Sequence, residues 1–311
     1  MNNIDHKPLV SIGVPAYNGE EYLAECLDSI KNQSYSNWEC VISNNFSSDN
    51  TAAVAEKYVK SDPRFKLFHT KELLPITDNW NFCYSLISDD ASYFKLLPAD
   101  DWITPNFISE MVDVMEKHPE VGICSSIRLV DKELRGEGLD INNGNRFDGK
   151  EVLIKQLKQE LNVTSSVNSV LYRNESLKKL VYHPEIYQDE AFHQDTFLSY
   201  ELLMQWDLGF IFQVLSYTRR HENTVTSTVT SKLNTRLYFR EYALFKFKSI
   251  DSSLEEEYKK NRNRYAYFMF RTRISSDTRK LEWHQNRLKR PISTGEYLRA
   301  IFKHMLKRRK R

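Results

Sequence analysis

The sequence predicts an α/β fold, with a mostly parallel central sheet flanked by helices and a helical C-terminal extension. Three observations support this prediction. Short apolar runs, typical of buried strands, alternate with segments of helical periodicity about five times in the first 126 residues. Each run ends in a turn or a polar loop, and from Lys232 onward the pattern is long, charged and helical. Such alternation implies βαβ units with right-handed crossovers.

The strands predicted in the first half are short and rich in β-branched and aromatic residues. They cover residues 9–15, 38–43, 65–69, 93–97 and 121–126. The helices between them carry apolar residues at the spacing that places side chains on one helix face. They cover residues 20–33, 51–60, 78–87 and 105–118. Pro105 suits the first turn of the last helix.

The second half of the chain is predicted to be less regular. Residues 127–148 are polar and rich in Gly and Asn, which indicates a loop. The expected elements that follow are a helix and then a strand over 147–172, a helix over 194–204, a strand over 210–215 and a polar loop over 217–230. The predicted domains are an α/β domain over 1–230, with halves 1–126 and 127–230, and a helical region over 231–311.

Net charge is only +2, but the charge is unevenly distributed. Residues 287–311 hold ten Lys or Arg and one acid, a net charge of +9 against −7 for the rest of the chain. The four cysteines have no CxxC spacing, so we expect free thiols in a reducing compartment. The N-terminus lacks the pattern of a signal peptide, and no apolar run reaches the ~18 residues that span a bilayer. A cytoplasmic protein, or one lying on a membrane without crossing it, is expected.

Three loops follow predicted strands and should meet at one edge, because ligands bind at the carboxyl ends of strands in such sheets. They cover residues 17–19, 44–49 and 98–101. In the third loop, Asp100 and Asp101 supply the carboxylate oxygens that a hard divalent cation prefers. The alternative is a helix N-cap, where Asp is also favoured. The second loop could bind a base and ribose, or form a turn before a helix.

The joint order and spacing of these motifs resemble those of the family 2 glycosyltransferases. The opening reads VSIGVPAYN over 10–18, the second loop NNFSSDNT over 44–51, and the third PADDW over 98–102. The resemblance covers about residues 8–225 and is strongest over 8–126. It implies a GT-A (Rossmann-like) fold and an inverting, metal-dependent transfer from a nucleoside-diphosphate sugar, with UDP as the expected nucleotide.

The resemblance also implies a donor site. The residues expected to line the nucleotide or its diphosphate are Pro15, Ala16, Tyr17, Glu20, Asn45, Asp100 and Arg219. Asn45 stands where the family has the Asp that reads the base. An Asn side chain can still accept from a pyrimidine N3–H and donate to O4. Asp100 matches the acid that holds Mn²⁺ or Mg²⁺. Pro98 replaces the first acid of the family motif, so phosphates and waters would complete the metal shell.

On the acceptor side, Asp195 matches the general base that deprotonates the acceptor hydroxyl. It could instead cap the helix that follows, and Asp189 and Glu190 are competing acids. Further acceptor-side candidates are Asp101, Trp102 and Gln194, with residues 163–172 as a possible acceptor wall. Trp80 and Trp102 could be sugar-stacking platforms, although packing in the core is favoured for Trp80 because it lies on a helix face.

The loop 219–221 corresponds to a segment that the family places near the diphosphate. His221 is expected to bind the metal or a phosphate, and Arg219 to stabilise charge on the leaving group. The alternative is an ordinary solvated surface loop.

The C-terminus combines apolar and basic residues at helical spacing. The apolar positions are Tyr297, Leu298, Ile301, Phe302, Met305 and Leu306. A basic amphipathic helix of this kind favours an anionic membrane surface, although packing on the catalytic domain would also explain it. Nucleic-acid binding is not expected, because no RNA- or DNA-binding module accompanies the basic run.

The predicted function is sugar transfer to a glycan or lipid-linked glycan in surface polysaccharide biosynthesis, such as lipopolysaccharide or capsule, on the cytoplasmic face of the inner membrane. A nucleotidyltransferase is disfavoured, because residues 15–19 lack a Gly-rich loop with a basic residue. The remaining alternative is a degenerate nucleotide- or glycan-binding or assembly module, supported only by the departures at Asn44, Asn45 and Pro98.

Overall fold

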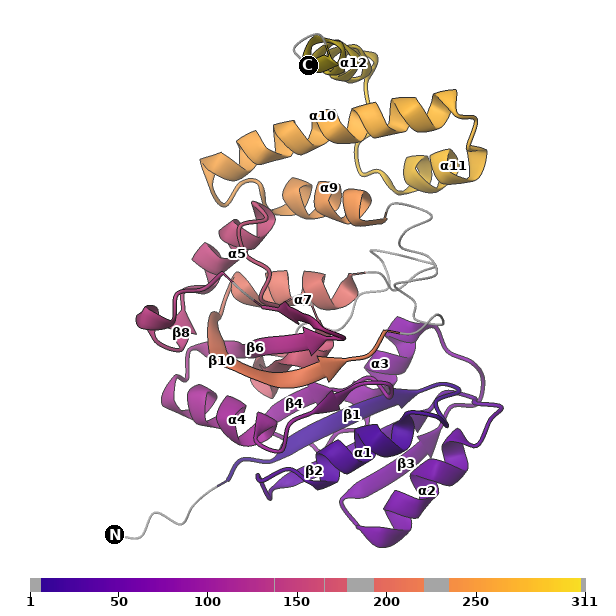
Figure 1. The fold of residues 1–311 in the computed structure, drawn as a ribbon, viewed down its shortest axis with the longest axis vertical. Helices are drawn as coiled ribbons and strands as arrows, with labels where there is room; N and C mark the ends of the chain where they lie inside the picture. Colours follow the sequence, from indigo (N-terminus) through magenta and orange to yellow (C-terminus); the bar gives the residue numbers. More distant parts are fainter. Residues whose placement is uncertain (1–6, 137, 165, 178–192, 221–234, 309–311) are drawn as a thin grey trace. The chain divides into compact units, whose positions relative to one another are not determined.

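Two compact units make up the chain in the computed structural model, which describes residues 7–136, 138–164, 166–177, 193–220 and 235–308 (Figure 1). The first unit comprises residues 1–156 and 160–220, and the second comprises 157–159 and 221–311. The domain boundary predicted near residue 230 lies outside the described residues and stays a prediction.

The described part of the first unit contains one sheet of ten strands. The strands are β1 (Val10–Ala16), β2 (Trp38–Asn44), β3 (Phe65–His69), β4 (Tyr93–Leu96), β5 (Trp102–Ile103), β6 (Val121–Val130), β7 (Glu133–Arg135), β8 (Arg146–Phe147), β9 (Val170–Arg173) and β10 (Asp207–Thr218). Their order is β3-β2-β1-β4-β9-β6-β10-β5, with β7 paired to β6 and β8 to β10.

The six strands β1 to β4, β6 and β10 all run in the same direction. The pairs β2–β3, β1–β2, β1–β4 and β6–β10 are parallel, whereas β9 is antiparallel to both β4 and β6. Every residue of β2 is buried, as expected for a parallel strand covered on both faces. The prediction of an α/β fold with a mostly parallel sheet is confirmed.

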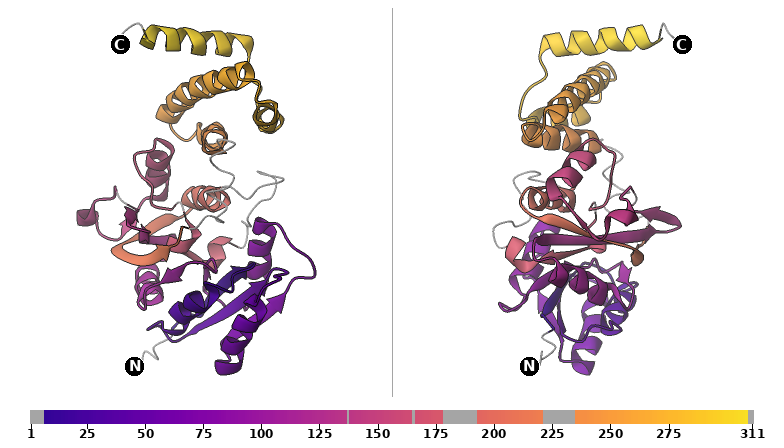
Figure 2. Two further views of the ribbon diagram at one scale, coloured as in Figure 1. Left: turned by 45° about the vertical axis from the view of Figure 1, so that its right-hand side comes forward. Right: turned by 90° about the vertical axis from the view of Figure 1, so that its left-hand side faces the viewer.

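Helices cover both faces of the sheet (Figure 2). They are α1 (Leu23–Lys31), α2 (Thr51–Ser61), α3 (Ile76–Ser85), α4 (Phe107–Lys117), α5 (Gly149–Leu157), α6 (Asn174–Leu177) and α7 (Gln194–Leu203). Ile12 of β1 belongs to the core that includes Leu27 of α1. On the other face, a Cβ added at Gly13 would lie 3.0 Å from Cβ of Cys83 in α3, so strand and helix approach closely there.

Two predictions for the middle of the chain differ from the structure. The predicted loop 127–148 begins inside β6, because residues up to Val130 pair with both β10 and β7. Among the described residues of 163–172, where the strand was expected, only residues 170–172 belong to a strand, β9. Residues Val167–Ser169 form a 3-10 turn, η2, in which the Ser166 side chain accepts from the Asn168 N–H. Polar side chains that bond to the nearby backbone favour such turns over strands.

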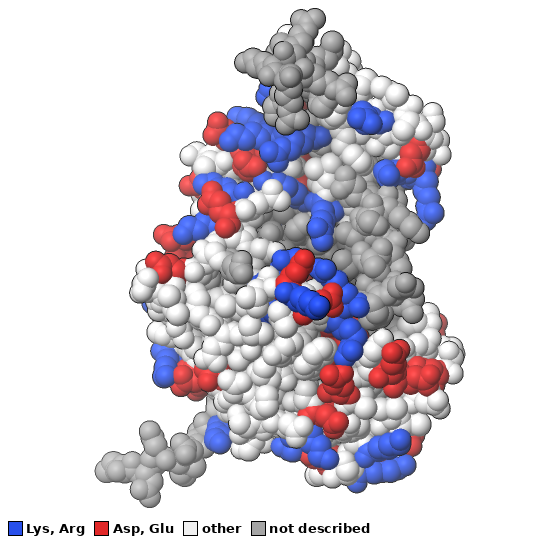
Figure 3. All heavy atoms as spheres, viewed as in Figure 1, with Lys and Arg blue, Asp and Glu red and all other residues white. Residues whose placement is uncertain are grey.

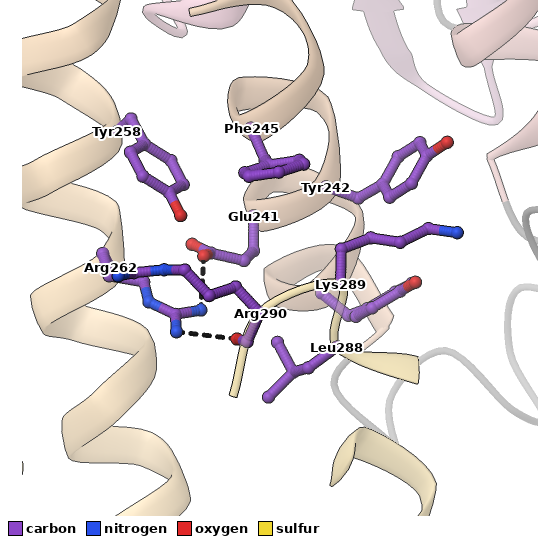
Figure 4. Close-up of a pocket in the computed structure, with 9 residues that line it drawn as sticks. Glu241, Tyr242, Phe245, Tyr258, Arg262, Leu288, Lys289 and Arg290 are labelled. Carbon is purple, nitrogen blue, oxygen red and sulfur yellow. Dashed lines mark hydrogen bonds and ion pairs between the residues drawn. The ribbon is translucent and has the colours of Figure 1, made fainter. Parts of the chain in front are cut away.

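The described part of the second unit is helical. Its helices are α9 (Thr235–Phe247), α10 (Ser252–Ile274), α11 (Thr278–Arg287) and α12 (Thr294–Arg308). The buried Arg262 of α10 donates to Glu241 of α9 at 2.8 Å and to Glu296 of α12 at 3.0 Å. It also donates to the carbonyls of Arg290 and Pro291 (Figure 4). One guanidinium therefore connects two helices and the segment before α12 to α10.

A small pocket opens beside this ion-pair network (Figure 4). Tyr242, Phe245 and Tyr258 contribute aromatic rings to its lining, and Lys289 Nζ lies 5.9 Å from the ring centre of Tyr242. None of the residues that line this pocket belongs to the candidate site described below.

Charged side chains of both signs are interspersed over the face seen in Figure 3. Among the described residues, no helix combines the length and apolar character needed to cross a bilayer. The four cysteines are buried, and each carries a free thiol.

Candidate active site

The first two predicted loops are joined at the carboxyl edge of the sheet. Ala16 at the end of β1 is in register with Asn44 at the end of β2. Beyond them, the Asn18 N–H donates to Ser47 Oγ at 3.0 Å, and the Gly19 N–H donates to Thr51 Oγ1 at 2.8 Å. The third loop follows β4, which is parallel to β1, so all three loops meet at one edge as predicted.

Glu20, a predicted donor-site residue, bonds to the second loop. Its Oε2 atom accepts from the N–H of Asn50 at 2.9 Å and from the Asn50 side chain at 2.7 Å, while its own N–H donates to Asp49. Ala16 is buried, and its carbonyl accepts from the Asn45 N–H, so it contributes backbone to this edge. Pro15 is half-buried beside it.

Asn45 is buried, and both ends of its side-chain amide bind another part of the chain. Nδ2 donates to the Leu74 carbonyl at 2.9 Å, and Oδ1 accepts from the Leu74 N–H at 2.9 Å. In this arrangement the amide fastens residues 70–74 to the sheet edge. Two exposed aromatic rings lie on the same edge, those of Tyr17 and Phe46, at 52% and 60% exposure.

The two acids of the third loop have different surroundings. Asp100 is half-buried, whereas Asp101 is buried and accepts from the Arg219 N–H at 3.0 Å. Burial raises the pKa of Asp101 to about 8, and the neighbouring Asp100 charge adds to this effect. The Arg219 N–H and the charges of Arg128 and Lys95 act in the opposite direction.

Arg219 holds the acid loop from the end of β10. Its Nε atom donates to the Asp100 carbonyl at 3.3 Å, and its guanidinium forms an ion pair with Glu25. The guanidinium also lies 4.5 Å from the ring centre of Tyr22 and 4.9 Å from that of Trp102. Trp102 itself stacks on Tyr217, with ring centres 5.1 Å apart. Arg219 therefore lies beside the predicted metal loop. One face of the Trp102 ring is occupied by Tyr217.

Asp195 lies in the first turn of α7, where its Oδ1 atom accepts from the Thr196 N–H at 2.7 Å. Burial raises its pKa, whereas the Thr196 N–H and the Arg128 charge lower it. The bond to Thr196 satisfies an N–H at the helix start, so the capping contact is present, and the role as base stays a prediction. Gln194 is buried, and within the described part of the chain its Nε2 atom has no hydrogen-bond partner.

Arg128 was missed by the sequence analysis. It lies on the part of β6 that was predicted to be a loop, and its Nη1 atom donates to Thr218 Oγ1 at 3.3 Å. Burial lowers its pKa, while the charges of Asp195 and Asp101 raise it. The charges of the predicted base and of the acid loop therefore both act on this cation. The alternation of Ile127 and Leu129 around it was the signal that could have extended the strand.

Three predicted or competing residues, Asp189, Glu190 and His221, lie outside the described residues. Within the described ranges, no group of three or more His, Cys, Asp or Glu residues gathers as a metal centre. Trp80 is half-buried on α3, which is less than the core packing predicted for it. Predicted roles for these residues remain untested.

Comparison with known proteins decides the family. The model of "Glycosyl transferase family 2" matches residues 11–181, more than half of the chain. The chain belongs to glycosyl transferase family 2. The match includes the three loops that meet at the sheet edge, β9 and η2.

Curated relatives of this family 2 glycosyltransferase match over part of their length. An uncharacterised glycosyltransferase of Haemophilus influenzae is 34% identical over 132 residues, which cover 42% of this chain and 40% of the relative. The putative glycosyltransferase EpsH of Bacillus subtilis is 30% identical over 151 residues, 48% of this chain and 43% of the relative. The chain thus spans less than half the length of these two relatives.

Solved structures of low sequence identity share the fold of this family 2 glycosyltransferase. S. aureus TarS 1–349 in complex with UDP-GlcNAc has a TM-score of 0.57 at 15% identity, covering 76% of this chain and 66% of that one. Mannosyltransferase PcManGT from Pyrobaculum calidifontis, in complex with GDP-Man and Mn²⁺, has a TM-score of 0.55 at 16% identity, covering 90% and 73%. The predicted GT-A fold is therefore confirmed.

Proposed function

We propose that this family 2 glycosyltransferase moves a sugar, with inversion, from a nucleoside-diphosphate sugar to a hydroxyl of a glycan or lipid-linked glycan. UDP is the expected nucleotide, and surface polysaccharide biosynthesis is the expected context. One observation carries the proposal: Arg219 ties the Asp100–Asp101 loop to the end of β10. The charges of Asp101 and Asp195 both raise the pKa of Arg128. The names of TarS, bound to UDP-GlcNAc, and PcManGT, bound to GDP-Man, agree with a nucleotide-sugar donor.

The acid loop suits Mn²⁺ or Mg²⁺, because both its side chains end in carboxylate oxygens and Asp101 is buried beside a like charge. Asp100 would hold the ion, with His221 as a second ligand, and the diphosphate and waters would complete the shell. When bound, such an ion neutralises charge on the leaving diphosphate. Asp101 keeps the loop in place through the Arg219 N–H.

Asp195 would act as the base. Its carboxylate takes the proton of the acceptor hydroxyl while that oxygen forms a bond to the anomeric carbon. The bond from this carbon to the diphosphate oxygen breaks, and the nucleoside diphosphate leaves with the electron pair. Arg219, which lies beside the Asp100–Asp101 loop, would bind the departing phosphate, and the Arg128 charge lowers the pKa of Asp195. Gln194 and Trp102 remain acceptor-side candidates.

The first experiment compares binding of UDP, GDP, CDP and dTDP, each with and without Mn²⁺, by calorimetry and thermal shift. We expect one nucleotide to bind in a metal-dependent way in the wild type and to lose this dependence in Asp100→Ala. Asp195→Asn should bind the same nucleotide with unchanged affinity and transfer no sugar. Transfer at the wild-type rate by Asp195→Asn would refute its role as base.

A degenerate binding module is the second candidate, and one observation favours it. Both ends of the Asn45 amide are bound to Leu74, so this side chain would have to leave its partners to read a base. If no nucleotide binds under any condition, this second function replaces the first.

We further propose that α12 binds an anionic membrane surface, which would place the enzyme on the cytoplasmic face of the inner membrane. Leu298 and Phe302, one turn apart, are 63% and 64% exposed, and the exposed Arg299 and Lys303 flank them. The opposite side of the helix is buried at Ala300. The helix therefore packs on its own unit and still offers apolar and basic side chains to a second surface.

Co-sedimentation with vesicles tests the membrane proposal. The Leu298→Ser/Phe302→Ser variant should lose binding to vesicles that contain phosphatidylglycerol, while pure phosphatidylcholine vesicles bind neither protein. Ile274→Ser is the matched control, since Ile274 is 64% exposed on α10. Equal binding by the double variant and the wild type would overturn the proposal.

A further inference from the structure

Lys95 is a charged side chain in the middle of the sheet. It lies on β4, five residues before Asp100, and is fully buried. Burying an ammonium group is costly unless hydrogen bonds replace its water. In the described part of the chain no carboxylate forms an ion pair with it. A neutral apolar residue would be the ordinary occupant of such a position.

The hydrogen bonds of Lys95 all go to one turn. Its Nζ atom donates to the carbonyls of Val167 and Asn168, each at 2.7 Å. Both carbonyls belong to η2, which lies between α5 and β9 in the chain. The Lys95 amine has at least two N–H donors in either protonation state and can serve two successive carbonyls, which an apolar side chain of similar length cannot do. Lys95 therefore binds η2 to the centre of the sheet.

The η2 turn contacts the acid loop through the end of β10. Asn168 Nδ2 donates to the Tyr217 carbonyl at 2.8 Å and to Thr218 Oγ1 at 3.0 Å. The next residue, Arg219, donates its N–H to Asp101. An unbroken series of hydrogen bonds and one covalent step thus connects Lys95 to the acid loop.

The same turn also faces the predicted base. Ser199 of α7 donates to the Thr164 carbonyl, three residues before Val167, at 3.2 Å and to the Asp195 carbonyl at 2.9 Å. The backbone N–H of Val167 lowers the pKa of the Asp195 carboxyl. Asn168 and Val167 are adjacent, so one short segment contacts both sides of the site. Any shift of η2 would change the distance between Asp195 and the acid loop.

We propose that Lys95 is a positioning residue that sets the spacing between Asp195 and the Asp100–Asp101 loop by holding η2 in place. The proposal rests on the transfer reaction proposed above. Lys95 touches no reacting atom. Its effect is on the step in which the two sides of the site act together, and binding of the nucleotide alone does not depend on it.

The test is a double-mutant cycle with Lys95→Met and Asn168→Ala. Lys95→Met keeps the length of the side chain and removes its donors, and Asn168→Ala cuts the bond from η2 to β10. We expect each variant to lower kcat about 10- to 100-fold, since misplacement of reacting groups by about 1 Å has effects of this size. The kcat of the double variant should be little lower than that of either single variant, because both substitutions release the same turn, η2.

Three further measurements separate positioning from folding. UDP binding with Mn²⁺, measured by calorimetry, should stay within about threefold of the wild type, and each variant should unfold cooperatively above the assay temperature. Lys66→Met, on β3 of the same sheet, is the control for loss of a strand lysine; its side chain is 47% exposed and pairs with Glu39. It should leave kcat unchanged.

Two results would overturn the inference alone: wild-type kcat in Lys95→Met, or strictly additive losses in the double variant. If Lys95→Met does not fold, wild-type kcat in Asn168→Ala decides against it. Absence of transfer by the wild type would overturn the proposed function and this inference together.

Discussion

Phe46 shows how a single residue can carry local strain at a functional edge. It adopts a left-handed backbone conformation with φ 57°, and its ring is 60% exposed. Non-glycine residues in this conformation are destabilised by roughly 1–2 kcal/mol. Because the Phe46 ring is mostly exposed, its burial offsets little of this destabilisation. Backbone strain of this kind is often found at ligand sites, and Tyr17 lies on the same carboxyl edge, so the Phe46 ring is a candidate ligand contact.

Phe46→Gly should raise the free energy of unfolding by up to about 1 kcal/mol, because glycine adopts positive φ without a steric penalty. The measurement is thermal or urea unfolding without ligand. Tyr17→Gly is the control, since Tyr17 has no positive φ and glycine there should destabilise. A less stable Phe46→Gly protein would show that the ring makes stabilising contacts instead.

Asp101 predicts a pH dependence of stability. Its pKa is raised to about 8 in the folded protein, against an ordinary value of 3.8. The folded state therefore holds this proton more tightly than the unfolded state, and the contribution of Asp101 to stability falls as pH rises from about 4 to 8.

Asp101→Asn removes this dependence. Relative to the wild type, the variant should be more stable at pH 8 than at pH 5, measured by thermal unfolding in a chelator so that metal ions do not contribute. The neighbouring Asp100→Asn serves as the comparison on the same loop. A stability difference that does not change with pH would contradict the raised pKa.

At the scale of elements, the sequence predicts regular structure well where apolar periodicity is strong. The strand predicted over 65–69 coincides with β3, and α2 extends the predicted helix by a single residue. The extension of β6 beyond residue 126 was missed because it depends on pairing with β7 and β10, which are distant in the chain. The bond between Asn45 and Leu74 was unpredictable for the same reason.

Arg128 is the residue beside the candidate site that the sequence analysis most clearly failed to predict. The sequence alone does not show whether a polar residue lies in a loop or on a strand that faces two acids. The family motifs pointed to Asp100, Asp195 and Arg219, whereas Arg128 lies on a part of β6 that forms only through pairing with β7 and β10. Motifs thus identify the loops of a predicted site and omit the residues that the sheet supplies.

The start of α5 depends on close backbone approach. A Cβ added at Gly149 would lie 2.0 Å from the Trp206 carbonyl oxygen, and backbone cannot move aside cheaply. Gly149→Ala should therefore lower the free energy of unfolding by about 1–3 kcal/mol. Gly295→Ala on α12 is the control: no atom lies within 4 Å of the added Cβ, and alanine should stabilise that helix. Equal stability of both variants would contradict the close approach.

At the scale of the whole molecule, the candidate site and the Arg262 network belong to different units. Arg262→Met leaves the buried Glu241 and Glu296 without this partner and should destabilise the helical unit by about 3–5 kcal/mol. Nucleotide binding should persist, because the residues proposed to bind it, apart from His221, lie in the first unit. Unfolding curves and calorimetry together test this. Lys60→Met, at an exposed pair with Glu56, is the control and should change stability little.

The reversed strand β9 has a consequence for how the chain folds during synthesis. β1 to β4 form a continuous parallel block from the first part of the chain, so they can pair as soon as they are made. β6 is synthesised after the short strand β5, but its place is separated from β4 by β9, which comes later. Until β9 arrives, β4 and β6 each present an unpaired edge. The ribosome-bound protein is therefore most prone to mispairing after β6 has emerged, and chaperone binding should peak at that stage.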